Sequence, residues 1–134
     1  MLKSLNHITI AVKNLEKSFE FYVELLGMKP HAKWTRGAYL SLDDLWFCLS
    51  VSVDKSSPSQ DYTHIAFEID IENINAMRER LQVNDVPEWK KNSSEGDSIY
   101  FLDPDGHKLE VHCGSLQTRL ESLKVKPYEG LKLY

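Results

Sequence analysis

Two histidines at matching positions of a repeated segment are the first residues whose type and spacing could do chemistry. His7 opens the run His-Ile-Thr-Ile-Ala-Val, and His64 opens the run His-Ile-Ala-Phe-Glu-Ile. A single histidine on a strand is most often a hydrogen-bonded structural residue. Two histidines at equivalent points of a repeat favour a pair of metal ligands instead.

A third ligand is available in the last strand-like segment, Lys108–His112. Alternation puts Glu110 and His112 on one face of that strand and Leu109 and Val111 on the other. Alternation alone does not choose between Glu110 and His112. Two neutral imidazoles and one carboxylate suit a divalent first-row ion and leave coordination positions open for a substrate. Such a site, with a net charge of about +1, should attract an anionic chelating ligand.

The elements that would position these residues form a βαβββ unit that occurs twice. Each histidine-led run alternates like a strand, with apolar residues on one face and the histidine on the other. A helix should follow each run, bounded in the first unit by Asn14 as N-cap and Gly27 as C-terminal stop, and ended in the second by Asn84, which tolerates left-handed geometry. The apolar stripes of these helices are Leu15, Phe19, Tyr22, Val23 and Leu26, and then Ile71, Ile74, Met77 and Leu81.

Three short strands are expected after each helix. They span residues 29–34, 38–41 and 45–51 in the first unit, and 86–90, 98–102 and 108–112 in the second. Asp103–Gly106 is the turn between the last two, Asp54–Asp61 is the connector between units, and 116–123 is a short helix. We expect one domain, 1–134, with modules of about 1–53 and 62–114 and a tail at 115–134. Two four-stranded sheets, each with its helix on one face, would form a cup into which His7 and His64 point.

Composition and charge exclude several classes of protein. A chain of 134 residues is the size of one domain, and 42% hydrophobic with 27% charged residues is typical of a globular protein. The net charge of −4, with both signs interspersed, argues against a nucleic-acid binder. No membrane-spanning run or signal-peptide pattern is found, so a cytoplasmic location is expected. In that reducing compartment Cys48 and Cys113 are expected to be free thiols.

Several longer motifs extend over nearly the whole chain. They are Leu5-Asn6-His7 with Thr9, Gly37–Leu40, Leu45-Trp46 with Cys48–Ser50, Asp61–His64, Ser94–Ser98, Tyr100–Glu110 and Pro127-Tyr128. On these motifs the chain resembles the fosfomycin-resistance proteins of the FosA type, within the vicinal-oxygen-chelate superfamily. The resemblance implies an α+β fold of two βαβββ modules that form a metal-binding cup. It also implies a homodimer that exchanges modules, with His7 from one protomer and His64 and Glu110 from its partner.

The resemblance further implies an activity and a set of site residues. The activity would be the Mn(II)- and K⁺-dependent addition of glutathione to the epoxide of fosfomycin, with His7, His64 and Glu110, rather than His112, as metal ligands. Thr9 would bind the phosphonate and Tyr39 would help to ionise the thiol. The substrate-binding residues implied are Trp46, Tyr62, Lys90, Ser94, Ser98, Tyr100 and Arg119; the potassium loop is Ser94, Glu95, Gly96 and Ser98; the thiol site is Trp34, Arg36 and Ser50.

Thr9 also bears on the choice of thiol, because relatives that use bacillithiol tend to carry cysteine at this position. Arg36 and Ser93 depart from the family, which commonly has a glutamine and a basic residue there. Four alternative functions remain on this reasoning: a fosfomycin epoxide hydrolase, a bacillithiol- or cysteine-using transferase, an extradiol dioxygenase, and a drug-sequestering binding protein of the same fold.

Overall fold

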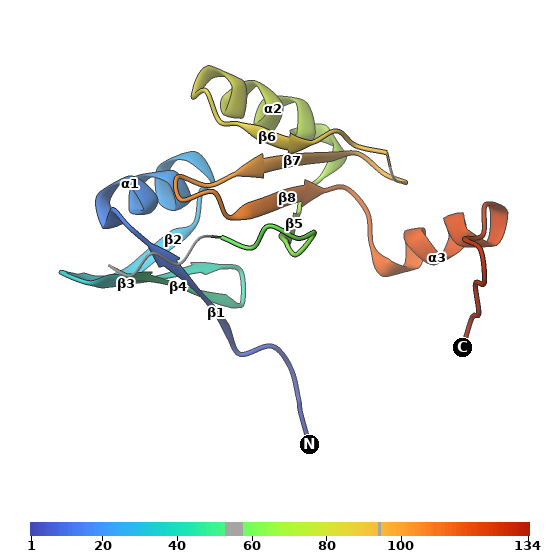
Figure 1. Cartoon of the computed structure of the whole chain (residues 1–134), viewed down its shortest axis with the longest axis horizontal. Helices are drawn as coiled ribbons and strands as arrows, with labels where there is room; N and C mark the ends of the chain where they lie inside the picture. The colour runs from blue at the N-terminus through green and yellow to red at the C-terminus, as the bar shows by residue number, and fades with distance from the viewer. Residues whose placement is uncertain (53–57, 94) are drawn as a thin grey trace. The chain divides into compact units, whose positions relative to one another are not determined.

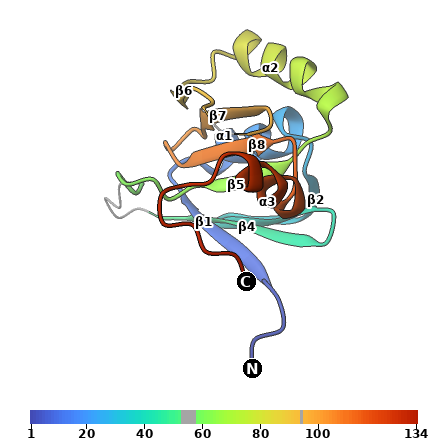
Figure 2. The same cartoon turned by 90° about the vertical axis from the view of Figure 1, so that its right-hand side faces the viewer.

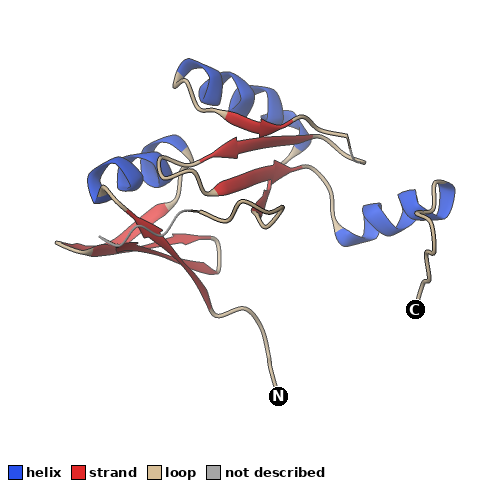
Figure 3. Ribbon diagram, viewed as in Figure 1, coloured by secondary structure: helices blue, strands red, loops and turns tan. Residues whose placement is uncertain are grey.

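A computed structural model of the chain describes residues 1–52, 58–93 and 95–134. It divides into two compact units, the first made of Met1–Tyr62 with Asp103–His107, and the second of Thr63–Leu102 with Lys108–Tyr134. Each unit contains one four-stranded sheet and at least one helix (Figures 1 and 3). No helix in the described ranges is both long and apolar enough to cross a membrane.

Both sheets have the same topology, which confirms the predicted βαβββ repeat. The elements of the first unit are β1 (His7–Val12), α1 (Leu15–Glu20), η1 (Phe21–Leu25), β2 (Lys29–Trp34), β3 (Gly37–Leu42) and β4 (Leu45–Val51). Those of the second are β5 (Ile65–Glu68), η2 (Ile71–Asn73), α2 (Ile74–Val83), β6 (Glu88–Lys90), β7 (Ser98–Leu102), β8 (Lys108–His112) and α3 (Leu116–Val125). The N-terminal sheet has the order β1-β4-β3-β2, and the C-terminal sheet has the order β5-β8-β7-β6. In each sheet the first strand runs parallel to the last, and the other pairs are antiparallel.

The first helix begins as predicted and ends differently. The Asn14 side chain accepts a hydrogen bond from the Lys17 backbone N–H at 3.1 Å, which satisfies one of the donors left free at a helix start. After α1 the chain widens into the π-helical turn η1, closed by the Leu26 N–H on the Phe21 carbonyl at 3.0 Å. Gly27, at φ +81°, then reverses the chain, as predicted.

The second helix ends at Asn84, as predicted, but the left-handed residue is the one that follows it. Asn84 does not adopt left-handed geometry, since its φ is −96°. Its side-chain amide donates to the Arg80 carbonyl at 2.8 Å, which satisfies a free carbonyl of the last turn. The left-handed residue is Asp85, at φ +52°. Asn84 therefore ends the helix as predicted, but it does so as a side-chain cap, and the left-handed geometry falls on its neighbour.

The core of each unit lies between the sheet and its helix. Buried residues from alternate positions of the strands are Ile10, Val12, Leu40, Phe47 and Leu49 in the first unit and Phe67, Ile99, Phe101, Leu109 and Val111 in the second. In the second unit, α2 lies along one side of the C-terminal sheet (Figure 2) and buries Ile74 and Leu81. Ile71, predicted for the same apolar stripe, is 60% exposed because it lies in the preceding turn η2.

The turn between β7 and β8 belongs to the first unit, although the two strands belong to the second. Asp103, 5% exposed, anchors this turn. Its Oδ1 accepts hydrogen bonds from the Asp105 and His107 N–H groups at 2.9 and 2.8 Å, and its Oδ2 accepts one from the Tyr22 hydroxyl at 2.8 Å. The His107 ring also contacts the Ala11 carbonyl at 2.7 Å, so the turn is bound to both β1 and the first helical segment.

Candidate active site

A buried carboxylate lies at the centre of the candidate site in the second unit. Glu110, on β8, is 6% exposed. Its Oε2 is 3.0 Å from His64 Nε2, and its Oε1 accepts a hydrogen bond from the Ser98 hydroxyl at 2.6 Å. The same hydroxyl is 2.7 Å from His112 Nδ1. Two of the three predicted metal ligands, His64 and Glu110, therefore meet through atoms that can both bind a metal ion.

Strand register explains why these side chains converge. On β8, Glu110 pairs with Ala66 of β5 and with Tyr100 of β7. Side chains at directly paired positions of neighbouring strands point to the same face of a sheet. Tyr100 is buried at this face, and Lys90 Nζ lies 4.8 Å from the centre of its ring. The predicted substrate residues Lys90, Ser98 and Tyr100 are thus gathered around Glu110.

Trp89 also belongs to this face, although the sequence pattern did not predict it there. Its ring lies 5.5 Å from that of His64 and 5.2 Å from that of Tyr100, and its indole N–H donates to the Leu109 carbonyl at 3.0 Å. The pairing of β6 with β7 shifts register between Glu88 and Lys90. Such a bulge changes the direction of a side chain, so alternation could not assign Trp89 to a face.

The predicted potassium loop contains a buried carboxylate oxygen with unmet hydrogen-bonding capacity. Glu95 Oε2 is buried and accepts no hydrogen bond from the described residues, although Arg119 Nε lies 3.6 Å away. The Arg119 guanidinium also donates to the Glu95 carbonyl at 3.3 Å, and the Asn92 amide donates to the Gly96 carbonyl at 2.8 Å. A buried oxygen in this condition is often completed by a water or a cation. Ser94, predicted for this loop and for substrate binding, lies outside the described residues.

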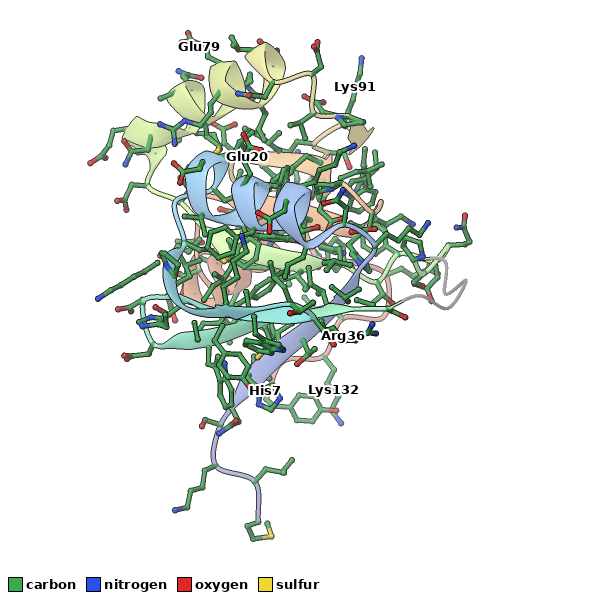
Figure 4. All side chains as sticks on the ribbon, turned by 90° about the vertical axis from the view of Figure 1, so that its left-hand side faces the viewer. His7, Glu20, Arg36, Glu79, Lys91 and Lys132 are labelled. Atoms are coloured by element: carbon green, nitrogen blue, oxygen red, sulfur yellow. The ribbon has the colours of Figure 1, made fainter. Side chains whose placement is uncertain are left out.

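An exposed aromatic row covers the corresponding face of the N-terminal sheet. The ring of His7 lies 4.6 Å from that of Trp46, which lies 5.2 Å from Tyr39, which in turn lies 4.8 Å from Trp34. Figure 4 shows His7 on the side of this sheet away from the helix that carries Glu20. Gly37 permits the row, because a Cβ there would lie 2.6 Å from the Trp34 ring. We call these four side chains the aromatic row.

The other residues predicted in the first unit lie around the aromatic row or at the end of the unit. Thr9 is exposed and pairs with Cys48 on β4. Ser50 pairs with Gly37 at the end of the β3–β4 hairpin, where the Arg36 guanidinium donates to the Val51 carbonyl at 3.1 Å. Tyr62 is exposed at the end of the continuous first segment. Cys48 and Cys113 are both free thiols, as predicted.

The three predicted metal ligands are divided between the units. His64 and Glu110 belong to the second unit, and His7 belongs to the first. Within the described ranges, no group of three or more His, Cys, Asp or Glu side chains gathers as a metal site. The structure therefore brings two predicted ligands into contact.

The family of the chain follows from comparison with known proteins. Residues 4–111 match the model of the Glyoxalase/Bleomycin resistance protein/Dioxygenase superfamily, so the chain belongs to that family. It is 52% identical to a glutathione transferase, FosA, of Serratia marcescens, over 98% of this chain and 95% of that protein. It is also 39% identical to a metallothiol transferase, FosB, of Staphylococcus epidermidis, over 96% of both chains. These similarities confirm the family resemblance and the α+β fold class drawn from the sequence.

Solved structures of fosfomycin resistance proteins share this fold. A variant of FosX from Listeria monocytogenes, in complex with Mn(II) and 1S,2S-dihydroxypropylphosphonic acid, has a TM-score of 0.78 at 31% identity, covering 90% of this chain and 99% of that one. FosX from Mesorhizobium loti has a TM-score of 0.77 at 29% identity, covering 90% and 99%.

Proposed function

We propose that this chain is a fosfomycin resistance enzyme that adds glutathione to the epoxide of fosfomycin. The observation that carries the proposal is the pairing of buried Glu110 with His64 beside Ser98, Tyr100 and Lys90. An anionic oxygen and an imidazole nitrogen in contact form half of a metal site, and hydroxyl and ammonium groups beside them suit a phosphonate. Similarity to the glutathione transferase FosA of Serratia marcescens supports glutathione as the thiol, and similarity to the fosfomycin resistance protein FosX supports fosfomycin as the substrate.

The proposed metal is Mn(II), bound by His7, His64 and Glu110. The Mn(II) ion present in the FosX complex supports this choice, and so does the mixed nitrogen and oxygen donor set. When bound, the ion supplies Lewis-acid stabilisation of the negative oxygen that forms as the epoxide opens. Because His7 belongs to the first unit, we also propose the module-exchanged homodimer, in which a second copy covers the exposed aromatic row.

The residues of the chain have two tasks in this reaction, which are to hold the phosphonate and to help ionise the thiol. Lys90, Tyr100 and Arg119, with Thr9, hold the phosphonate by charge and hydrogen bonds and so turn the epoxide carbon toward the thiol. Ser98 lines the substrate pocket beside Glu110. Trp46, Tyr62 and Ser94 complete the proposed substrate pocket. The glutathione sulfur forms a new C–S bond, the epoxide C–O bond breaks, and the resulting alkoxide takes a proton from solvent.

The thiol must lose its proton before it attacks, since an ordinary thiol with a pKa near about 8.5 is mostly protonated at neutral pH. We assign this assistance to Tyr39, whose ring lies in the aromatic row between Trp34 and Trp46. Trp34, Arg36 and Ser50 are the proposed contacts of the glutathione tripeptide. A cytoplasmic location, where glutathione is abundant, is part of the same proposal.

Potassium is the second proposed cofactor, held by Ser94, Glu95, Gly96 and Ser98. The support comes from Glu95 Oε2, which is buried and accepts no hydrogen bond from the described part of the chain. A carboxylate oxygen in that state suits a hard cation better than an apolar neighbour. A bound cation there would also offset the charge of the substrate.

The test is product identification with a panel of nucleophiles. Purified protein, Mn(II), K⁺ and fosfomycin are incubated with glutathione, bacillithiol, cysteine or no thiol, and the products are identified by mass spectrometry. We expect the glutathione adduct to dominate. A diol formed without thiol would support the hydrolase alternative, which the diol-like ligand of the FosX complex also favours. Tight binding of fosfomycin without any product would support a sequestering protein and contradict the proposal.

A matched pair of histidine variants tests the metal assignment. His64→Ala removes a proposed ligand that contacts Glu110, whereas His31→Ala removes an exposed histidine whose Nε2 lies 2.7 Å from Ser41 Oγ. We expect the first variant to lose Mn(II)-dependent activity and the second to retain it. Full activity in His64→Ala would contradict the assignment.

A further inference from the structure

The hydrogen-bond pattern around Ser98 determines which atom of His112 carries a proton. Ser98 Oγ has one hydrogen, and the carboxylate oxygen Glu110 Oε1, at 2.6 Å, can only accept it. In the hydrogen bond between Ser98 Oγ and His112 Nδ1, at 2.7 Å, the imidazole must then be the donor. The order of donation is therefore His112 Nδ1–H to Ser98 Oγ, and Ser98 O–H to Glu110 Oε1.

The ring of His112 is held in place by two glycines. A Cβ at Gly96 would lie 2.9 Å from His112 Cε1, and a Cβ at Gly114 would lie 2.9 Å from His112 Nε2. Both glycines have positive φ, +76° and +140°, so other residues would be strained there in any case. The far edge of the imidazole thus fits a space bounded by backbone, and its Nδ1 is directed at Ser98.

Comparison with the N-terminal sheet shows that the fold does not need these polar side chains. We call Ser98, Glu110 and His112 the glutamate cluster. The pairing Ser98 with His112 in the C-terminal sheet corresponds to the pairing Gly37 with Ser50 in the N-terminal sheet. At the position of Glu110 the N-terminal sheet has Cys48, paired with Tyr39 as Glu110 is with Tyr100. The same scaffold forms without a carboxylate or an imidazole here, so the glutamate cluster serves another purpose than folding.

We propose that His112 is a positioning residue for the metal-binding carboxylate, acting through Ser98. By directing the Ser98 hydroxyl onto Oε1, His112 holds the carboxylate in one orientation and leaves Oε2 turned toward His64 Nε2, at 3.0 Å. Outer partners of this kind orient metal ligands and commonly alter metal affinity by about 10–100-fold. The inference rests on the proposed function, because it takes Glu110 and His64 as metal ligands.

The experiment measures Mn(II) binding directly, without substrate. Metal-free protein in potassium buffer is titrated with Mn(II), and the free ion is followed by electron paramagnetic resonance. We expect His112→Phe, which keeps a ring but has no hydrogen-bond donor, to raise the Mn(II) dissociation constant by about tenfold. His112→Asn, whose amide N–H lies near the position of Nδ1, should restore most of the affinity. His112→Gln, whose amide lies one bond further out, should not.

A double-mutant cycle tests whether His112 acts through Ser98. If it does, His112→Phe should have no further effect on Mn(II) affinity in a Ser98→Ala protein, so the two changes are not additive. The matched control is His31→Phe, since His31 Nε2 also lies 2.7 Å from a serine hydroxyl, that of Ser41, but with no carboxylate beyond it. The control should bind Mn(II) as the unmodified protein does. Thermal unfolding of each variant identifies those that do not fold. If His112→Phe does not fold, the comparison of His112→Asn with His112→Gln decides whether the donor at Nδ1 matters.

Two results would overturn the inference and leave the proposed function intact: unchanged Mn(II) affinity in a folded His112→Phe or His112→Gln protein, or additive effects in the cycle. Failure of the unmodified protein to bind Mn(II) would overturn the proposed metal site and this inference together.

Discussion

Each unit of the described structure has one acidic residue that is buried as a whole, and the two carboxylates are satisfied in different ways. Asp103, in the first unit, accepts hydrogen bonds from two backbone N–H groups and from the Tyr22 hydroxyl. Glu110, in the second unit, accepts one hydrogen bond from Ser98, and its other oxygen faces His64. Their exposures are nearly equal, at 5% and 6%, so burial alone does not distinguish them.

The kind of donor separates a structural carboxylate from a functional one. Backbone donors belong to the fold, so Asp103 is fully engaged as soon as the β7–β8 turn has formed. The groups around Glu110 are side chains, and the N-terminal sheet has the same topology without equivalents of them. A buried carboxylate whose partners are side chains that can also bind metal is costly for stability and useful for function. The following changes test this contrast, from the largest expected effect to the smallest.

Glu110→Gln should have the largest effect, and on activity alone. The glutamine carbonyl can still accept from Ser98, and its amide can donate to His64, so the folded network persists while the negative charge is lost. We expect Mn(II)-dependent activity to fall by about a thousandfold, because Lewis-acid stabilisation is worth several kcal/mol and each 1.4 kcal/mol is a factor of about ten. Cys48→Ser, at the equivalent position of the other sheet, is the control and should retain the activity within about threefold.

Thermal melts of the same two variants are the second half of this test. The melting temperature of Glu110→Gln should equal or exceed that of the unmodified protein. A large loss of stability together with retained activity would reverse the roles assigned to the two carboxylates.

Asp103→Ala should have the next largest effect, and on stability. It leaves two backbone N–H groups and the Tyr22 hydroxyl without their acceptor in a buried site. At about 1–3 kcal/mol for each buried group left unsatisfied, we expect a loss of about 3 kcal/mol in the free energy of unfolding. Urea unfolding followed by circular dichroism measures it. If this variant keeps its stability, the structural role of Asp103 is wrong.

The sequence predicted the backbone elements of the fold better than it predicted the side-chain contacts. The bounds of β2, β4, β7 and β8 agree with the prediction, because alternation and turn residues report directly on extended backbone. The end of α2 at Asn84 was also predicted, but the left-handed residue that follows it was not. Asn84 and Asp85 both tolerate left-handed geometry, and the choice depended on a side-chain bond to Arg80 that no propensity expresses.

The sequence predicted which side chains of the candidate site share a sheet face, but it did not predict the hydrogen bonds between them. Alternation put Glu110 and His112 on the same face and could not choose between them, and the structure joins both through Ser98. Trp89 was not predicted as a site residue, because a bulge in the three-residue strand β6 breaks the alternation on which the prediction depends. Which residues share a face follows from period, whereas which atoms meet depends on side-chain rotamers and on strand irregularities.

Tyr22→Phe should have a smaller effect than Asp103→Ala, since Asp103 keeps both backbone donors. It removes one hydroxyl that donates to a buried carboxylate at 2.8 Å. Hydrogen bonds to charged groups contribute about 1.5–3 kcal/mol, so we expect a loss near about 1.5 kcal/mol in urea unfolding. In an Asp103→Asn background the same change should cost less, because the charge is gone; equal costs in both backgrounds would mean that Tyr22 acts by packing alone.

The smallest expected effect is a pH dependence specific to Asp103. Burial raises the pKa of this carboxyl above its ordinary value of 3.8, outweighing His107 and the hydrogen bonds from backbone and Tyr22, which lower it. The folded protein therefore holds the Asp103 proton more tightly than the unfolded chain does. This contribution to stability is complete below pH 3.8 and is lost as the pH rises through the folded-state pKa.

Comparison with Asp103→Asn isolates that contribution, because the other titrating groups cancel in the difference. The free energy of unfolding of the unmodified protein minus that of the variant should decrease as the pH is raised from about 4 toward neutrality. Urea titrations at a series of pH values measure the difference, with the slopes of the two proteins compared to verify the same unfolding reaction. A difference that grows with pH would mean that the folded state favours the ionised form of Asp103, as expected if its three donors outweighed its burial.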